Sequence, residues 1–323
     1  MKKILITGGL GFIGLNLVYD ILKDKKVRLF NIDKESPYSN KIIINNNKYK
    51  FIKLDITDKK KLYECIKNIK PDLVFHLAAE SHVDRSIISS KEFIYSNIIG
   101  TFNLLEILNH LKTKKKLNAK FRFIHVSTDE VYGSILKGKF TEKSNYKPNS
   151  PYSASKASSD LLVRSWFKTY NFPAIITNCS NNFGPYQNEE KFIPKVITNI
   201  LSKKKIPIYG NGKNMRDWIY VDDHISALKT IAIKGKIGEN YNIGGQNILT
   251  NNEIVQLIFD LMKEKYINFD PSSLIEYVSD RKGHDFRYAI SNKKINNKLN
   301  WYPQYKFKNS LIKTIDWYCK KFK

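Results

Sequence analysis

A glycine-rich turn between an apolar run and an amphipathic one is the feature that most constrains the fold of this chain. The stretch TGGLGFIG places Gly8, Gly11 and Gly14 between residues 4–7, which are typical of a buried strand, and residues 12–23, which have helical spacing. Glycine permits a tight turn and the close approach of a pyrophosphate, and the free N–H groups of the following helix attract the anion. The pattern predicts dinucleotide binding, although a glycine-rich turn can also be only a turn.

An acid at the end of the second expected strand predicts which dinucleotide is bound. Asp33 closes residues 27–33, 19 positions after the last glycine of the turn. A carboxylate there can accept the ribose 2′-OH and would repel a 2′-phosphate, so we expect NAD rather than NADP. The neighbouring Lys34 is a cation that could favour a phosphate. Asp55 and Ile56, at the end of the third strand, are expected to border the adenine.

Short apolar runs alternate with longer helical patterns through the first 180 residues. Strands are expected at 4–7, 27–33, 50–56, 72–78, 121–127 and 173–178, and helices at 12–23, 93–111, 152–170 and, in a looser second part, near 191–203, 222–233 and 250–265. Continuous apolar strands with helices between them are typical of a parallel, doubly wound α/β sheet of the Rossmann type. We expect a dinucleotide-binding domain of residues 1–178, joined by parts of 215–245, and a smaller interleaved α/β lobe of residues 179–323.

Composition narrows the class of protein. Lys and Arg number 55 against 30 Asp and Glu, a formal charge of +25, but the lysines are scattered and Lys, Asn and Ile are all abundant, as in AT-rich genomes. RNA binding and steering of an anionic ligand remain alternatives. Cys65, Cys179 and Cys319 lack metal-binding spacing, so we expect no metal and free thiols in a reducing compartment, the cytoplasm. We expect no signal peptide and no membrane span.

The stretch PYSASKAS predicts a redox pair. Tyr152 and Lys156 are four residues apart and share one face of an expected helix. A phenol keeps its proton up to a pKa of about 10, but a nearby ammonium and a nicotinamide cation would favour the phenolate. Tyr152 could then take the hydroxyl proton of an alcohol while NAD takes the hydride. In a lysine-rich chain this spacing also arises by chance, and Tyr152 could simply pack.

The stretch VSTDEVYG, residues 126–133, puts two acids at the expected end of a buried strand. Side chains of adjacent residues diverge in an extended backbone, so Asp129 and Glu130 could reach different carbons of one substrate. Burial beside a second carboxylate would keep a proton on Asp129, as a general acid requires. The alternative is that both acids only cap the turn that follows.

Together these motifs resemble the extended short-chain dehydrogenase/reductase family and, within it, the nucleotide-sugar 4,6-dehydratases. The resemblance covers nearly the whole chain and rests on TGGLGFIG, HLAAESHVDRS, STDEVYG, PYSASKASSD, NCSNNFGPYQ, IYGNGKNMRDWIYVDDH, YNIGG and DRKGHDFRYAI. It implies oxidation of dTDP-glucose or UDP-glucose at C4, elimination of water across C5 and C6, and return of the hydride to C6. The product would lead toward deoxysugars such as rhamnose.

The resemblance also implies residue roles. Thr128 would bind the 4-OH beside Tyr152, Asp129 would protonate the departing C6 hydroxyl, and Glu130 would remove the C5 proton. Cofactor contacts are implied for Gly8, Gly11, Phe12, Ile13, Gly14, Asp33, Lys34, Ser36, Asp55, Ile56, Leu77, Ala78, Ala79, Ser81, Ser96, Tyr152, Lys156 and Asn182. Glu80 would lie beside them. Substrate contacts are implied for Ser81, Thr128, Asn181, Lys191, Phe192, Pro207, Ile208, Tyr209, Arg216, Asn251, Arg281 and His284.

Departures from the family pattern and rival functions remain. Phe183 replaces a usual Tyr, Phe192 a usual Leu and Ser96 a frequent Thr, and the segment after Asp33 is shorter.

A nucleotide-sugar 4-epimerase shares the fold and the Tyr–Lys pair but needs no Asp–Glu pair, and GDP-mannose 4,6-dehydratases or UDP-glucuronate decarboxylases tend to have Ser–Glu there. A non-enzymatic NAD-sensing or RNA-associating scaffold is a further alternative. The family resemblance implies a homodimer through helices 93–111 and 152–170.

Overall fold

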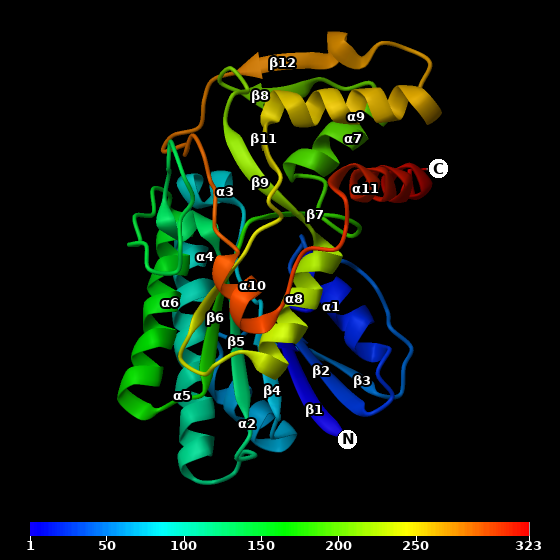
Figure 1. The fold of residues 1–323 in the computed structure, drawn as a ribbon. Coiled ribbons are helices and arrows are strands. Elements are labelled where there is room, and N and C mark those ends of the chain that lie inside the picture. The colour runs from blue at the N-terminus through cyan, green and yellow to red at the C-terminus, as the bar shows by residue number, and fades with distance from the viewer. Residues whose placement is uncertain (323) are drawn as a thin grey trace.

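A seven-stranded parallel sheet forms the centre of the computed structural model, which describes residues 1–322 (Figure 1). The strand order is β10-β6-β5-β4-β1-β2-β3. The strands are β1 (Lys2–Thr7), β2 (Val27–Asp33), β3 (Tyr49–Lys53), β4 (Leu73–His76), β5 (Arg122–Thr128), β6 (Ala174–Cys179) and β10 (Asn240–Ile243). The expected doubly wound Rossmann-type α/β fold is confirmed.

Helices cover both faces of this sheet because alternate strand residues point to opposite sides. The helices concerned are α1 (Phe12–Leu22), α2 (Lys59–Ile69), α5 (Gly100–Thr113), α6 (Pro151–Tyr170) and α8 (Val221–Lys234). In β1, Ile4 and Ile6 pack in the core shared with α1 and α8. Leu5 points the other way, into the core shared with α2, α5 and α6. Each face is therefore closed by a separate apolar layer.

A second lobe lies over the carboxyl ends of the central strands (Figure 1). Its elements are β7 (Asn181–Phe183), α7 (Phe192–Leu201), β8 (Ile206–Tyr209), β9 (Met215–Tyr220), β11 (Ile248–Thr250), α9 (Asn251–Lys265), η3 (Pro271–Leu274), β12 (Ile275–Val278) and α11 (Phe307–Lys321). Helix α10 (Lys293–Leu299) instead packs on β10 and α8, beside the central sheet (Figure 1). The second lobe includes a three-stranded sheet, β11-β9-β7, and a two-stranded sheet, β12-β8. Between them the chain returns through β10 to the central sheet, so the two parts interleave.

Several expected elements differ in their extent. The expected strand 50–56 ends at Lys53, because the backbone then turns at Asp55, whose carboxylate accepts the Thr57 N–H at 2.8 Å. The expected helix 93–111 is divided into α4 (Lys91–Phe93), a π-helical segment, η1 (Ile94–Ile99), and α5. The sequence patterns did not predict α2, α10, α11 or the short α3 (Val83–Ile88).

Candidate active site

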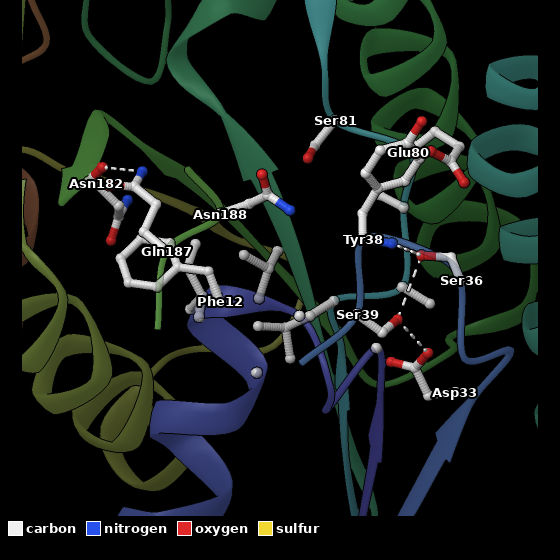
Figure 2. A pocket seen from close by; sticks show the side chains of 18 of the residues that line it. Phe12, Asp33, Ser36, Tyr38, Ser39, Glu80, Ser81, Asn182, Gln187 and Asn188 are labelled. Carbon is white, nitrogen blue, oxygen red and sulfur yellow. Dashed lines mark hydrogen bonds between the residues drawn. The ribbon is translucent and has the colours of Figure 1, made fainter. Parts of the chain in front are cut away.

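A cavity of about 660 Å³ opens at the carboxyl ends of the central strands. All of the residues expected to contact the cofactor line it, together with Thr128, Asp129, Glu130, Asn181 and Lys191. Figure 2 shows part of its wall, where the beginning of α1 at Phe12 lies opposite the segment that contains Asp33 and Tyr38. The fold thus gathers residues from the glycine turn after β1 to the end of α11 around one space.

The glycine turn provides a tight cradle in this wall. Gly8 has φ +77°, and a Cβ built on it would lie 2.6 Å from the Ala78 nitrogen. A Cβ on Gly14 would lie 2.1 Å from the Gly8 carbonyl oxygen, so neither position accepts a side chain. Helix α1 begins after Gly11 without a side-chain cap and without an acid in its first turn. The turn and the open helix N-terminus fit the pyrophosphate of a dinucleotide.

Asp33 anchors the opposite wall at the expected position of the ribose. One of its carboxylate oxygens accepts the Leu10 N–H at 3.0 Å. The other accepts the Glu35 N–H at 2.8 Å and the Ser39 hydroxyl at 3.2 Å, as Figure 2 shows for Ser39. These donors hold the carboxylate at the cavity wall, where its negative charge suits a ribose hydroxyl better than a phosphate.

The Asp–Glu pair lies in a turn at the end of β5. Thr128 ends the strand, and its hydroxyl accepts the Glu130 N–H at 3.3 Å as the cap of η2 (Asp129–Tyr132), a 3₁₀ turn. The expectation of extended backbone at the two acids is therefore wrong. The local hydrogen bonding of Thr128 draws the chain into a turn instead. Successive residues of a 3₁₀ turn point about 120° apart, so the side chains of Asp129 and Glu130 still diverge.

The two acids differ in their surroundings. Asp129 is 2% exposed, and its pKa is raised well above the ordinary value by burial, then by the charges of Glu130 and Asp217. Burial also raises the pKa of Glu130, but the nearby Arg216 and Lys191 charges oppose this increase. The pair therefore combines a deeply buried carboxyl that tends to keep its proton with a half-buried carboxyl whose charged form is favoured by cations.

Tyr152 and Lys156 are placed by the start of α6. Ser150 and Ser153 form a capping box that fixes the first turn, and the Tyr152 N–H donates to Ser86 Oγ at 3.2 Å. The Lys156 ammonium donates to the Val126 carbonyl at 2.8 Å. The helix is thereby fastened to β5, and both side chains are held against the cavity.

The pKa of Tyr152 does not fall in this environment. Burial raises it well above the ordinary value, the charges of Glu130 and Cys179 add to the increase, and a hydrogen bond with Thr128 opposes it. Burial also lowers the pKa of Lys156. The ammonium alone does not offset the burial of the phenol, so formation of the phenolate depends on further positive charge in the cavity.

Other residues expected to bind substrate lie outside this cavity, in or beside the second lobe; they are Phe192, Pro207, Ile208, Tyr209, Arg216, Asn251, Arg281 and His284. Asp84 gathers two of them, since it pairs with Arg281 Nε at 2.5 Å and accepts the Tyr209 hydroxyl at 3.3 Å. The His284 ring packs edge-on against Tyr209, with centroids 6.0 Å apart. The structure thus brings Tyr209, Arg281 and His284 together.

Three members of this second group are placed differently. Arg216 stacks over Tyr288, 4.3 Å from the ring centroid, and donates to the Asp285 carbonyl at 2.9 Å. Asn251 is the first residue of α9. The side chain of Ile208 is fully buried in the apolar core, so only its backbone could reach a ligand.

Sequence reasoning did not single out several residues of the cavity wall. Tyr38, Ser39, Asn40, Arg85, Cys179, Ser180, Tyr186, Gln187, Asn188, Glu189, Glu190 and Lys321 also line it. Arg85 lies within HLAAESHVDRS, whose density of polar residues was a usable signal. Lys321 is 130 residues from the next lining position along the chain, Lys191, and no sequence pattern pointed to it.

The described part of the chain contains neither a metal-binding cluster nor a helix that could span a membrane. Within residues 1–322, no group of three or more His, Cys, Asp or Glu side chains is placed to hold a metal ion. The helices described there are also too short or too polar to cross a membrane.

Comparisons with known proteins agree with this geometry. Residues 5–314 match the model of the GDP-mannose 4,6 dehydratase family. The dTDP-glucose 4,6-dehydratase of Neisseria meningitidis serogroup B is 46% identical, over 98% of this chain and 93% of that protein. The enzyme of the same name from Salmonella typhimurium is 48% identical over 98% and 92%. A crystal structure of DesIV, a dTDP-glucose 4,6-dehydratase from Streptomyces venezuelae with NAD bound, superposes with a TM-score of 0.90 at 38% identity, over 98% and 97% of the two chains.

Proposed function

We propose that this chain, which belongs to the nucleotide-sugar 4,6-dehydratases, converts dTDP-glucose into the 4-keto-6-deoxyglucose nucleotide. The observation that carries this proposal is the convergence of four side chains on one cavity with the glycine cradle: Asp129, Glu130, Tyr152 and Lys156. An epimerase would need the Tyr–Lys pair but not the two acids. The elimination of water needs an acid and a base in addition to the redox pair.

The first step requires a base near the C4 hydroxyl. The cradle and Asp33 would hold NAD, which supplies the redox chemistry by taking a hydride from C4 and returning it to C6. Tyr152 takes the C4 hydroxyl proton, and Thr128 orients that hydroxyl from the end of β5. Lys156, held against the Val126 carbonyl at 2.8 Å, contributes the positive charge that favours the phenolate.

Elimination follows because the C4 ketone makes the C5 hydrogen acidic. Glu130, whose charged form is favoured by Arg216 and Lys191, removes the C5 proton. Asp129 gives a proton to the C6 hydroxyl, which leaves as water, and its burial keeps that proton available. After C6 has been reduced, a proton returns to C5 and the product is complete.

The second lobe is proposed to hold the nucleotide part of the substrate. Arg216, Arg281 and His284 provide cationic or donor groups that suit a diphosphate and a nucleobase. Lys191 lies nearer the sugar, at the edge of the cavity, and donates to the Ser81 carbonyl at 2.8 Å. Residues 179–323 thus form the substrate lobe, and residues 1–178 with parts of 215–245 form the cofactor domain.

We also propose a homodimer in the cytoplasm. Large apolar side chains are exposed on η1 and α6: Ile94, Tyr95, Ile99 and Leu161. The two segments pack against each other in the chain. Burial of such faces would favour association of two copies.

The test of substrate choice compares two nucleotide sugars. Thymine and uracil differ by one methyl group, which a pocket distinguishes by about 1–3 kcal/mol. We expect faster formation of a 4-keto-6-deoxy sugar from dTDP-glucose than from UDP-glucose, measured as the ratio of kcat/KM. Preference for UDP-glucose would reassign the nucleotide, and conversion only to the C4 epimer would contradict the proposed reaction.

A further inference from the structure

A buried polar cluster behind the cavity includes an acid that the motif-based expectations left out. Asp160 lies on α6, one helical turn after Lys156, and is 1% exposed. Its Oδ2 accepts hydrogen bonds from Ser127 Oγ at 2.8 Å, Tyr146 OH at 3.0 Å and Asn178 Nδ2 at 3.2 Å. Its Oδ1 lies 3.1 Å from His125 Nε2. The carboxylate therefore connects α6 with two central strands and the loop before α6.

Three hydrogen-bond donors converge on Asp160 Oδ2, an arrangement that suits the oxygen of a carboxylate. A buried negative charge is stable only near positive charge. Lys156 is on the same helix face and docks on β5 at Val126, and Asp160 docks on the next residue, Ser127. The Lys156 ammonium and the Asp160 carboxylate thus bind two consecutive residues of β5, immediately before Thr128.

We propose that Asp160 is a positioning residue for the redox pair: its buried carboxylate maintains the ammonium form of Lys156 and fixes the end of β5 that carries the catalytic turn. The proposal rests on the roles proposed for Tyr152 and Lys156. Its second part is supported by Asn178, which donates both to Asp160 Oδ2 and to the Thr128 carbonyl, the latter at 3.3 Å. Asp160 is therefore connected to the end of β5 at Thr128 through Asn178, and it lies one helical turn from Lys156.

Among the groups that face Lys156, Asp160 is the main source of negative charge. Burial lowers the pKa of Lys156, and Asp160 and then Cys179 oppose that decrease. Burial also raises the pKa of the Cys179 thiol to about 12, so this group is neutral near neutral pH. On β4 and β5, burial lowers the pKa of His76 and His125, which leaves both uncharged. Tyr152, on the same helix, has a raised pKa.

The substitution Asp160→Asn tests the proposal because an amide fits the site. Its oxygen can keep the three donors, and its NH₂ group can turn toward the neutral ring of His125. Without the negative charge, the Lys156 ammonium loses its proton at lower pH. We therefore expect the alkaline limb of the rate of C4 oxidation, followed in a single turnover, to move to lower pH by on the order of 1 pH unit.

Two matched variants separate charge from packing. Tyr146→Phe removes one donor but keeps the carboxylate of Asp160. Asp160→Glu also keeps a carboxylate at this position, so we expect both variants to retain the wild-type alkaline limb. An unmoved limb in Asp160→Asn, or an equal shift in Tyr146→Phe, would overturn the proposal. If Asp160→Asn does not fold, a shifted limb in folded Asp160→Glu would also overturn it. A wild-type protein that oxidises no nucleotide sugar would instead contradict the proposed function.

Discussion

Lys34 forms an ion pair with Glu80, with 2.7 Å between Nζ and Oε1. The pair matters because Lys34 follows Asp33 at the expected ribose site, where an unpaired cation would favour a 2′-phosphate. Both residues line the cavity. Glu80 neutralises this cation, so Asp33 determines the sign of the charge that a bound dinucleotide meets.

We expect Asp33→Asn to weaken the preference for NAD over NADP. The substitution removes the negative charge that repels a 2′-phosphate and one acceptor for the ribose hydroxyl. The ratio of the two dissociation constants should change by at least about tenfold, equivalent to about 1.4 kcal/mol. Glu35→Gln is the matched control, since Glu35 is the next acid along the chain but pairs with Lys53 at 2.8 Å. An equal change in both variants would show a general charge effect rather than recognition by Asp33.

A second prediction concerns retention of the cofactor. The Arg85 guanidinium carbon lies 3.4 Å from the ring centroid of Tyr38, and Arg85 also pairs with Glu190 at 2.8 Å. This arrangement ties the segment after β2 to the far side of the cavity. Cation–π contacts contribute about 0.5–2 kcal/mol, so Tyr38→Ala should speed the release of bound NAD several-fold. Tyr38→Phe keeps the ring and should release NAD at the wild-type rate in an exchange assay with labelled cofactor.

A third prediction separates the roles of Glu130 and Tyr152. Glu130→Gln keeps the size of the side chain but loses the base, so oxidation at C4 should proceed while elimination stalls. A 4-keto-glucose nucleotide and reduced nicotinamide should then accumulate, and C5 should not exchange hydrogen with heavy water. Tyr152→Phe should block the first step, so neither species should form. Rapid exchange at C5 in Glu130→Gln would mean that another residue is the base.

The proposed dimer has its own test. Leu161 is 56% exposed on α6, which packs against η1, where Ile94 and Tyr95 are also exposed. A charge placed there would have to be buried on association, at a high cost in free energy. We expect Leu161→Glu to sediment as a monomer at micromolar concentration. Ile233→Glu, on the exposed side of α8, is the control and should leave the dimer intact. A wild-type monomer would contradict the proposal.

The cofactor end of the site could be predicted from the sequence because its chemistry is local. The glycine turn, Asp33 and the Tyr152–Lys156 spacing each depend on residues within a few positions of one another or at the ends of regular strands. These features specify backbone geometry and side-chain faces directly. Their gathering in one cavity follows from the parallel order of the strands.

The remaining features of the candidate site depend on contacts between distant parts of the chain. Asp84 and Arg281 are 197 positions apart, yet their ion pair organises the second group of expected substrate residues. Ile208 looked available in a motif but is fully buried, because β8 pairs with β12 and packs on the second lobe's core. The 3₁₀ turn at Asp129 depends on one hydroxyl, Thr128, that caps it. Periodicity carries no information about such contacts.

The most direct measurement follows a deuterium label at C4 of dTDP-glucose. Tyr152 and the two acids, Asp129 and Glu130, line one cavity, so oxidation and elimination should occur without release of the sugar. We expect the wild-type protein to yield a 4-keto-6-deoxy sugar whose methyl carbon, C6, carries the deuterium, with one solvent hydrogen at C5. Return of the label to C4, with glucose or its C4 epimer as the only sugar present, would contradict the proposed dehydratase reaction.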